Sequence, residues 1–219
     1  MNFDCIHLIF SKKIILICFS TVFNLFYSPH CATSQNGLMS YLPDTVNTRL
    51  EVLESAIEQT DYLLETIEHT PTEQNRLIVT LAQICLKIAK ENDLQIAEAK
   101  ATFWEIANIH EDQYYSSNNL LNLGRLNKIF YIFEQTNIHL WETRTKMISA
   151  NIYYHLQNDS MGLVINNQVL DSLKKFDSSK YPLLFGDTYK NRGNLLWSEG
   201  NMDSVIWNYE TNNLIVIYQ

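Results

Sequence analysis

Three asparagines recur at one fixed interval, and their residue type suits binding chemistry. Asn108, Asn151 and Asn194 are each 43 residues apart. A carboxamide offers both a hydrogen-bond donor and an acceptor. A regular row of them could therefore bind the main chain of an extended peptide without selecting its side chains. The alternative is that the row has no ligand and only reflects repetition in the chain.

The residue types that usually carry catalysis form no recognisable motif in this sequence. Cys85 has no base paired with it, and it adjoins an apolar stripe that includes Leu81 and Ile84, so we interpret it as a core thiol. There is no His-Glu-x-x-His motif, paired-cysteine motif, phosphate-binding glycine loop or Gly-x-Ser-x-Gly elbow. We therefore expect no catalytic residue, no metal and no cofactor. No metal-ligand motif includes the histidines at positions His69, His110, His139 and His155.

The first 34 residues have the three parts of an export signal. Lys12 and Lys13 precede an apolar run at 14–27, and a stretch of small residues follows at 31–34. The run is shorter than the roughly 20 residues that a membrane-spanning helix needs. We expect cleavage after Ser34 and a periplasmic or secreted product. An uncleaved anchor is the alternative, if residues 6–10 extend the run.

Composition favours a folded, acidic domain that has no affinity for nucleic acid. Of the 219 residues, 46% are hydrophobic and 18% are charged, and the formal net charge is -8. The apolar content is enough for a sizeable core, while the negative charge disfavours binding to phosphate backbones and anionic membranes. Because three of the four cysteines lie in the signal, Cys85 has no intramolecular disulfide partner.

The chain beyond a short linker, 35–44, is predicted to be all-helical. Glycine and proline are scarce, and apolar residues recur every three or four places between short polar breaks. The clearest start signal is Thr70-Pro71-Thr72-Glu73, where Thr70 would cap a helix and Glu73 would complete a capping box. The expected helices cover 45–68, 72–91, 93–110, 117–136, 138–157, 159–176, 181–199 and 202–219.

Internal repetition organises these helices into pairs. Small residues at Ala107, Ala150 and Gly193 recur every 43 residues, each late in a helix and followed by a polar break and a second helix. In the second helices Leu120, Leu163 and Ile206 keep the same interval. The repeats cover approximately 45–91, 93–136, 138–176 and 181–219. Stacked pairs bury faces that one pair cannot bury alone.

The last repeat resembles the tetratricopeptide family. Its Tyr189, Gly193, the turn at Gly200-Asn201 and Tyr209 look like that family's pattern of helix, tight turn and helix. The interval of 43 exceeds the family's usual 34, and Asn119 and Asn212 stand where small residues are usual. The resemblance implies a right-handed superhelical solenoid of antiparallel helix pairs over 45–219. A HEAT-like helical repeat, which fits the interval on length alone, is the alternative.

The resemblance also places candidate binding residues on a concave groove lined by the first helix of each pair. There the three asparagines would face a ligand. Lys190 and Asn194, four residues apart, look like one part of the family's clamp for a peptide carboxylate. Aromatic and arginine residues often anchor partners. The further groove candidates are Arg144, Tyr154, Trp104 and Trp197, for each of which packing is the alternative role.

The chain as a whole resembles the exported repeat arrays of Bacteroidetes regulatory proteins. We therefore expect a protein-binding or peptide-binding scaffold outside the cytoplasm, the sensory part of a truncated signalling protein. The alternative is a glycan-binding or nutrient-binding component of an outer-membrane uptake system, and an all-helical enzyme is the least favoured. The apolar helix at 202–219 lacks a polar cap, which suggests a continuation, a docking partner or a homodimer.

Overall fold

The computed structural model describes residues 39, 41–112, 118–197 and 200–217, with side chains for all of these except 109–112 and 213–217. The chain divides into two units, Met1–Arg49 and Leu50–Gln219. The expected export signal and half of the linker lie outside the described residues. In the first unit Leu42 and Val46 are buried, and the Asn47 side chain donates to the carbonyl of Met39 at 3.1 Å.

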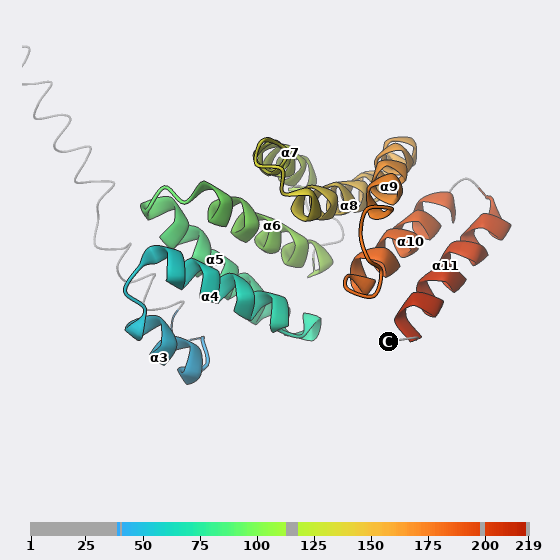
Figure 1. The fold of residues 1–219 in the computed structure, drawn as a ribbon. Helices are drawn as coiled ribbons and strands as arrows, with labels where there is room; N and C mark the ends of the chain where they lie inside the picture. The colour runs from blue at the N-terminus through green and yellow to red at the C-terminus, as the bar shows by residue number, and fades with distance from the viewer. Residues whose placement is uncertain (1–38, 40, 113–117, 198–199, 218–219) are drawn as a thin grey trace, which may run out of the picture. The chain divides into compact units, whose positions relative to one another are not determined.

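The secondary structure of the described ranges is helical, as the sequence predicts, and they contain no strand. Helix α3 spans the boundary between the units, and the later helices belong to the second unit (Figure 1). A short 3-10 turn, Thr72–Gln74, precedes α5. The α-helices are α3 (Asp44–Val52), α4 (Ala56–His69), α5 (Asn75–Glu91), α6 (Gln95–Asp112), α7 (Asn119–Gln135), α8 (His139–His155), α9 (Asp159–Leu173), α10 (Pro182–Trp197) and α11 (Met202–Ile217).

In the second unit consecutive helices pack together, and alternate helices also meet. Each helix from α4 to α10 contacts the next one along the chain. In addition α4 contacts α6, α6 contacts α8, and α8 contacts α10. The first helix of each expected pair thus contacts the first helix of the following pair.

The single helix expected at 45–68 is wrong, because a capping box interrupts it. Chain residues 53–55 separate α3 from α4. The Ser55 side chain accepts from the Glu58 amide at 3.2 Å, and the Glu58 carboxylate accepts from the Ser55 amide at 3.2 Å. This reciprocal pair satisfies amides that the start of a helix leaves free, so α4 begins at Ala56.

The start signal expected at Thr70 marks the end of a helix instead. Thr70 is the C-terminal cap of α4 in extended conformation, and its hydroxyl donates backwards to the Thr66 carbonyl at 2.7 Å. A residue that precedes proline is pushed out of the helical region, so Pro71 fixes this ending. The next α-helix begins at Asn75, without a side-chain cap.

Left-handed residues end several of the other helices. Asp93, Asn137, Gln157 and Gly200 have φ of 55°, 56°, 57° and 72°. In the first three cases the following amide bonds back to a carbonyl five residues earlier, as from Ile138 to Phe133 at 2.9 Å. This arrangement satisfies carbonyls left free at a helix end. Gln157 and Gly200 are 43 residues apart, as the repeat predicts.

Burial follows the same interval inside the helices. Each first helix has a buried threonine at an equivalent position, and these four residues are separated by 42, 43 and 43 positions. In Thr60, Thr145 and Thr188 the hydroxyl donates a hydrogen bond to a backbone carbonyl of the same helix, for example from Thr188 to Leu184 at 2.7 Å. A hydroxyl satisfied in this way leaves the methyl group free to pack. These residues are Thr60 in α4, Thr102 in α6, Thr145 in α8 and Thr188 in α10.

Two apolar clusters lie among helices α6 to α10. The larger one joins α6, α7 and the two ends of α8, and it contains Phe103, Ile106, Phe133 and Trp141. Phe133 and Ile106 are fully buried, and the rings of Phe103 and Trp141 meet edge to face at 5.3 Å. The smaller cluster joins α8, α9 and α10 through Met147, Val169, Leu173 and Leu184.

Candidate functional site

The three evenly spaced asparagines differ in what their side chains do. Asn108 is only 7% exposed, and its amide donates to the carbonyl of Trp104, four residues earlier in α6, at 2.8 Å. Asn194 is half-buried, and its carboxamide oxygen accepts from the Tyr209 hydroxyl. Asn151 is half-buried and bonds to no other described side chain or carbonyl. Of the three, only Asn151 therefore has a carboxamide with no hydrogen bond to a described residue, so both its donor and its acceptor are available to a ligand.

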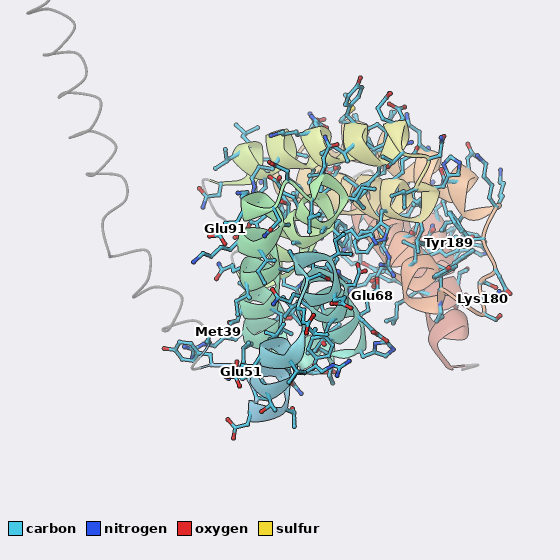
Figure 2. All side chains as sticks on the ribbon, turned by 60° about the vertical axis from the view of Figure 1, so that its left-hand side comes forward. Met39, Glu51, Glu68, Glu91, Lys180 and Tyr189 are labelled. Atoms are coloured by element: carbon cyan, nitrogen blue, oxygen red, sulfur yellow. The ribbon has the colours of Figure 1, made fainter. Side chains whose placement is uncertain are left out.

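Arg144 is held by several groups at once. Its Nη1 donates to the carboxylate of Glu68, labelled in Figure 2, at 3.1 Å, which ties α8 to the end of α4. The guanidinium lies 4.9 Å from the ring centroid of Trp141 and 5.8 Å from that of Trp104. Such cation–π contacts are stabilising. Arg144 and Trp104 thus come together, as expected of groove residues, but in contacts that the protein itself supplies.

Trp104 is partly buried against the larger apolar cluster. Its ring stands edge to face with Phe103 at 5.4 Å and with Trp141 at 6.0 Å. Its indole N–H is buried and has no partner among the described residues. With both neighbours packed against it, Trp104 offers little of its ring face to a partner.

Tyr154 lies at the end of α8, near the hydroxyl of Tyr209 in α11. Burial, followed by electrostatic repulsion between the two tyrosines, raises the pKa of Tyr209 above its ordinary value. The ring of Tyr209 also packs over Gly193, where an added Cβ would meet ring atoms at 3.2 Å. This explains why the residue before Asn194 is small.

The two remaining candidates are open to solvent. Lys190 is exposed on α10, and Trp197 at the end of the same helix is 59% exposed. Lys190 and Asn194 lie one turn apart as expected, and the Asn194 oxygen accepts a hydrogen bond from the Tyr209 hydroxyl. The candidates therefore separate into groups. Arg144 and Trp104 meet where α4, α6 and α8 come together, and Tyr154 and Asn194 lie beside Tyr209 where α8, α10 and α11 come together. The side chains of Lys190 and Trp197 are exposed.

Sequence reasoning missed the partners that organise both groups. Glu68 is 76 residues from Arg144, and no local pattern links them. Tyr209 was expected as a feature of the repeat and not as the partner of Asn194. Sequence reasoning also missed an ion-paired carboxylate on α8, Glu142. Although its partial burial opposes ionisation, hydrogen bonds from Lys146 and His139 hold the pKa of Glu142 below its ordinary value.

Two clefts lie beside the last three helices, and none of the candidate residues lines them. One, of about 490 Å³, is formed by α9, α10 and Trp207 of α11. The other, of about 360 Å³, lies between α10 and the start of α11. Both are lined by Arg192 and Trp207.

Cys85 is the core thiol that the sequence predicts. It is fully buried, and its Sγ lies 3.8 Å from the carbonyl of Thr60. Burial, reinforced by Asp61, raises the pKa of the thiol to about 12. Because the thiolate is the nucleophilic form, Cys85 is inert in the folded chain.

Three further features bear on site and partner. Within the described ranges no group of side chains is arranged to hold a metal ion, and none of the helices there is both long and apolar enough to span a membrane. Ile206 on α11 is 51% exposed, while the more apolar end of that helix falls where side chains are not described.

No family model, no curated protein and no solved structure matches the chain. The resemblance to helical-repeat families thus depends on the residues and packing of this chain alone.

Proposed function

We propose that the chain is a tetratricopeptide-like helical-repeat scaffold that binds a protein or peptide. The observation that supports this most is that α4, α6, α8 and α10 contact one another in succession while their buried threonines keep an interval of 42 or 43 residues. Repeats that place the same helix in the same layer build a continuous surface longer than one hairpin offers.

The part of this surface best suited to a ligand is centred on Asn151 and Tyr154 in α8. Asn151 keeps a donor and an acceptor available, and Tyr154 adds a large ring with a polar hydroxyl one turn further on. Tyrosine supplies contact area at a small cost in conformational entropy. Earlier in the same helix, Arg144 ties α8 to α4 through its ion pair with Glu68.

A peptide-display selection on the immobilised chain tests the proposal, followed by titration calorimetry with the enriched peptide. We expect Tyr154→Ala to weaken binding by about tenfold or more, as for a central aromatic contact, and Asn151→Ala to weaken it less. Tyr131→Ala is the matched control, because Tyr131 is a 60% exposed tyrosine on α7, a second helix. Equal losses in Tyr154→Ala and Tyr131→Ala would remove this face from consideration.

We further propose that the scaffold acts outside the cytoplasm as a sensory module. This depends on the export signal at residues 1–34 of the sequence. N-terminal sequencing of the expressed protein is the direct test, and a product that begins at Gln35 is expected. A product that keeps Met1 and stays in the cytoplasmic fraction would contradict export.

Glycan binding is the second function that we consider, because Trp197 exposes much of its indole ring. A glycan array with the same protein tests it. Saturable binding that is lost in Trp197→Ala but retained in Tyr154→Ala would favour sugar recognition over peptide recognition.

A further inference from the structure

The larger cleft has one wall made by a single face of α10. Phe185, Tyr189 and Arg192 line it from that helix at positions i, i+4 and i+7, a spacing that places side chains on one face. Trp207 of α11 lies against Tyr189, with ring centroids 5.8 Å apart and planes at 81°. Tyr189 is labelled in Figure 2. Two aromatic rings and a guanidinium thus meet at one end of the cleft.

The size of the cleft suits a small ligand or a terminal side chain. Its volume of about 490 Å³ lies within the range of roughly 300–1,000 Å³ that is usual for ligand pockets. The neighbouring cleft of about 360 Å³ is also lined by Arg192 and Trp207. Arg192 therefore lies where the two clefts adjoin.

Arg192 is the unpaired charge of the larger cleft. The other charged residues there, Asp171 and Lys174, form an ion pair with each other at 2.6 Å. Arg192 forms no ion pair with a described residue, and its Nε is buried without an acceptor. A buried donor with no partner is costly, and such a group calls for an explanation. An acceptor that enters the cleft would supply one.

The chemistry of a ligand that could supply this acceptor follows from the surrounding groups. A carboxylate matches a guanidinium in charge and in the spacing of its two oxygens. Tyr189, Trp207 and Phe185 present ring surfaces that favour an apolar or aromatic group beside it. A cationic ligand would be repelled by the positive charge of Arg192, and an inorganic anion would make no apolar contact with the rings.

We propose that the cleft between α9, α10 and α11 binds a carboxylate attached to an aromatic group, with the carboxylate on Arg192 and the ring against Tyr189 and Trp207. Two sources share this chemistry: a free aromatic acid, and a peptide chain whose last residue is aromatic. The proposal goes beyond the peptide-binding face at Asn151 and Tyr154, because no residue is common to the two sites.

The experiment is calorimetric titration of the full-length chain with N-acetyl-L-phenylalanine and with its C-terminal amide. The two probes differ only in the carboxylate, so the acid is expected to bind saturably and the amide about tenfold or more weaker. Phenylpropionate and the peptide N-acetyl-Ala-Ala-Phe separate the two sources. Tighter binding of the peptide indicates a chain terminus, and equal binding of all three acids indicates a free acid.

Matched variants assign the binding to the cleft. Arg192→Gln and Trp207→Leu are each expected to weaken binding of N-acetyl-L-phenylalanine by about tenfold. Lys190→Gln removes a charge from the same helix outside the cleft, and Trp197→Leu removes a tryptophan of similar exposure, 59% against 54%. Both controls should bind as the unmodified chain does, and so should Asn151→Ala and Tyr154→Ala.

The proposal would be overturned if the acid showed no saturable binding at concentrations up to about 10 mM, where even weak millimolar affinity is detectable. It would also be overturned if the amide bound as well as the acid. Equal losses of binding in Lys190→Gln and Arg192→Gln would overturn it too. If Arg192→Gln lowers the unfolding midpoint, the comparison of acid with amide on the unmodified chain still decides. Loss of binding in Tyr154→Ala alone would instead refer the ligand to the peptide-binding face.

Discussion

The pairs α6–α7 and α10–α11 occupy the same place in the repeat but use it differently. Phe103 and Ile106 in α6 and Tyr189 and Arg192 in α10 are equivalent positions, 86 residues apart. In α6 they are at most 3% exposed and belong to the larger apolar cluster. In α10 they line a cleft. Equivalent positions in the repeat thus lie on the same face of their helices. The residue type at each position determines whether that face packs into a closed core or lines a cleft.

This difference predicts unequal stability costs for the same truncation. Phe103→Ala should lower the free energy of unfolding by about 3–5 kcal/mol, because it leaves a cavity in a closed core. Tyr189→Ala should cost roughly 1 kcal/mol, because its half-buried ring already adjoins a cleft. Urea unfolding followed by circular dichroism measures both. Equal losses would mean that the face of α10 is as closed as that of α6.

Two glycines sharpen the comparison at the level of helix contact. At Gly162 in α9 an added Cβ would lie 2.4 Å from Leu195 Cδ2 and 3.3 Å from the Ala150 carbonyl oxygen. Gly162→Ala should therefore destabilise the fold by about 1–3 kcal/mol. At Gly124 in α7 an added Cβ meets nothing within 4 Å.

Gly124→Ala is accordingly expected to stabilise the fold by about 0.5–1 kcal/mol, because it lowers the entropy lost when the helix forms. The thermal midpoints of the two variants should move in opposite directions from that of the unmodified chain. A fall in both would show that α7 is packed more closely along its exposed side than the structure indicates.

Helix positions were predictable from the sequence because they depend on local pattern. The apolar period located the helices from 72–91 onward, and the interval of 43 residues matched equivalent buried positions. The exception was the break before α4. Ser55-x-x-Glu58 and Thr70-x-x-Glu73 have the same capping signature, and only the effect of Pro71 on Thr70 distinguishes them.

The site was less predictable because it depends on partners from distant helices. The spacing of Asn108, Asn151 and Asn194 is a property of the sequence. Whether each carboxamide is free depends on Tyr209 for Asn194 and on burial against neighbouring helices for Asn108. Arg192 gave no signal at all, because its lack of a partner becomes evident only once α9, α10 and α11 are packed.

The turns of two neighbouring pairs test the repeat at a single backbone position. Gln157 and Gly200 both have positive φ. In a side-chain-bearing residue this conformation costs about 1–2 kcal/mol, while glycine loses roughly 0.5–1 kcal/mol more entropy on folding. Gln157→Gly should therefore stabilise the fold by about 0.5 kcal/mol, and Gly200→Gln should destabilise it by a similar amount.

Urea midpoints of these two variants, measured at equal m-values, check the opposite signs. If both variants are destabilised, the side chain of Gln157 contributes a contact that Gly200 lacks, and the two turns are not equivalent.

The smallest expected effect is a pH dependence at the end of α8, between the two regions. Burial lowers the pKa of His155 below its ordinary value of about 6.5. The unfolded chain therefore binds a proton at this residue more readily than the folded chain, so stability is lost as the pH falls through about 6.5 and below. The lowered pKa of Glu142 also makes stability fall as the pH falls, but this stabilisation is lost only below the ordinary range of a carboxyl group.

Urea midpoints between pH 8 and pH 5.5 should consequently fall for the unmodified chain and fall less for His155→Gln. Glu142→Gln should keep the slope of the unmodified chain in this window, because the carboxylate does not titrate there. Identical slopes for all three proteins would mean that burial at the end of α8 does not lower the pKa of His155.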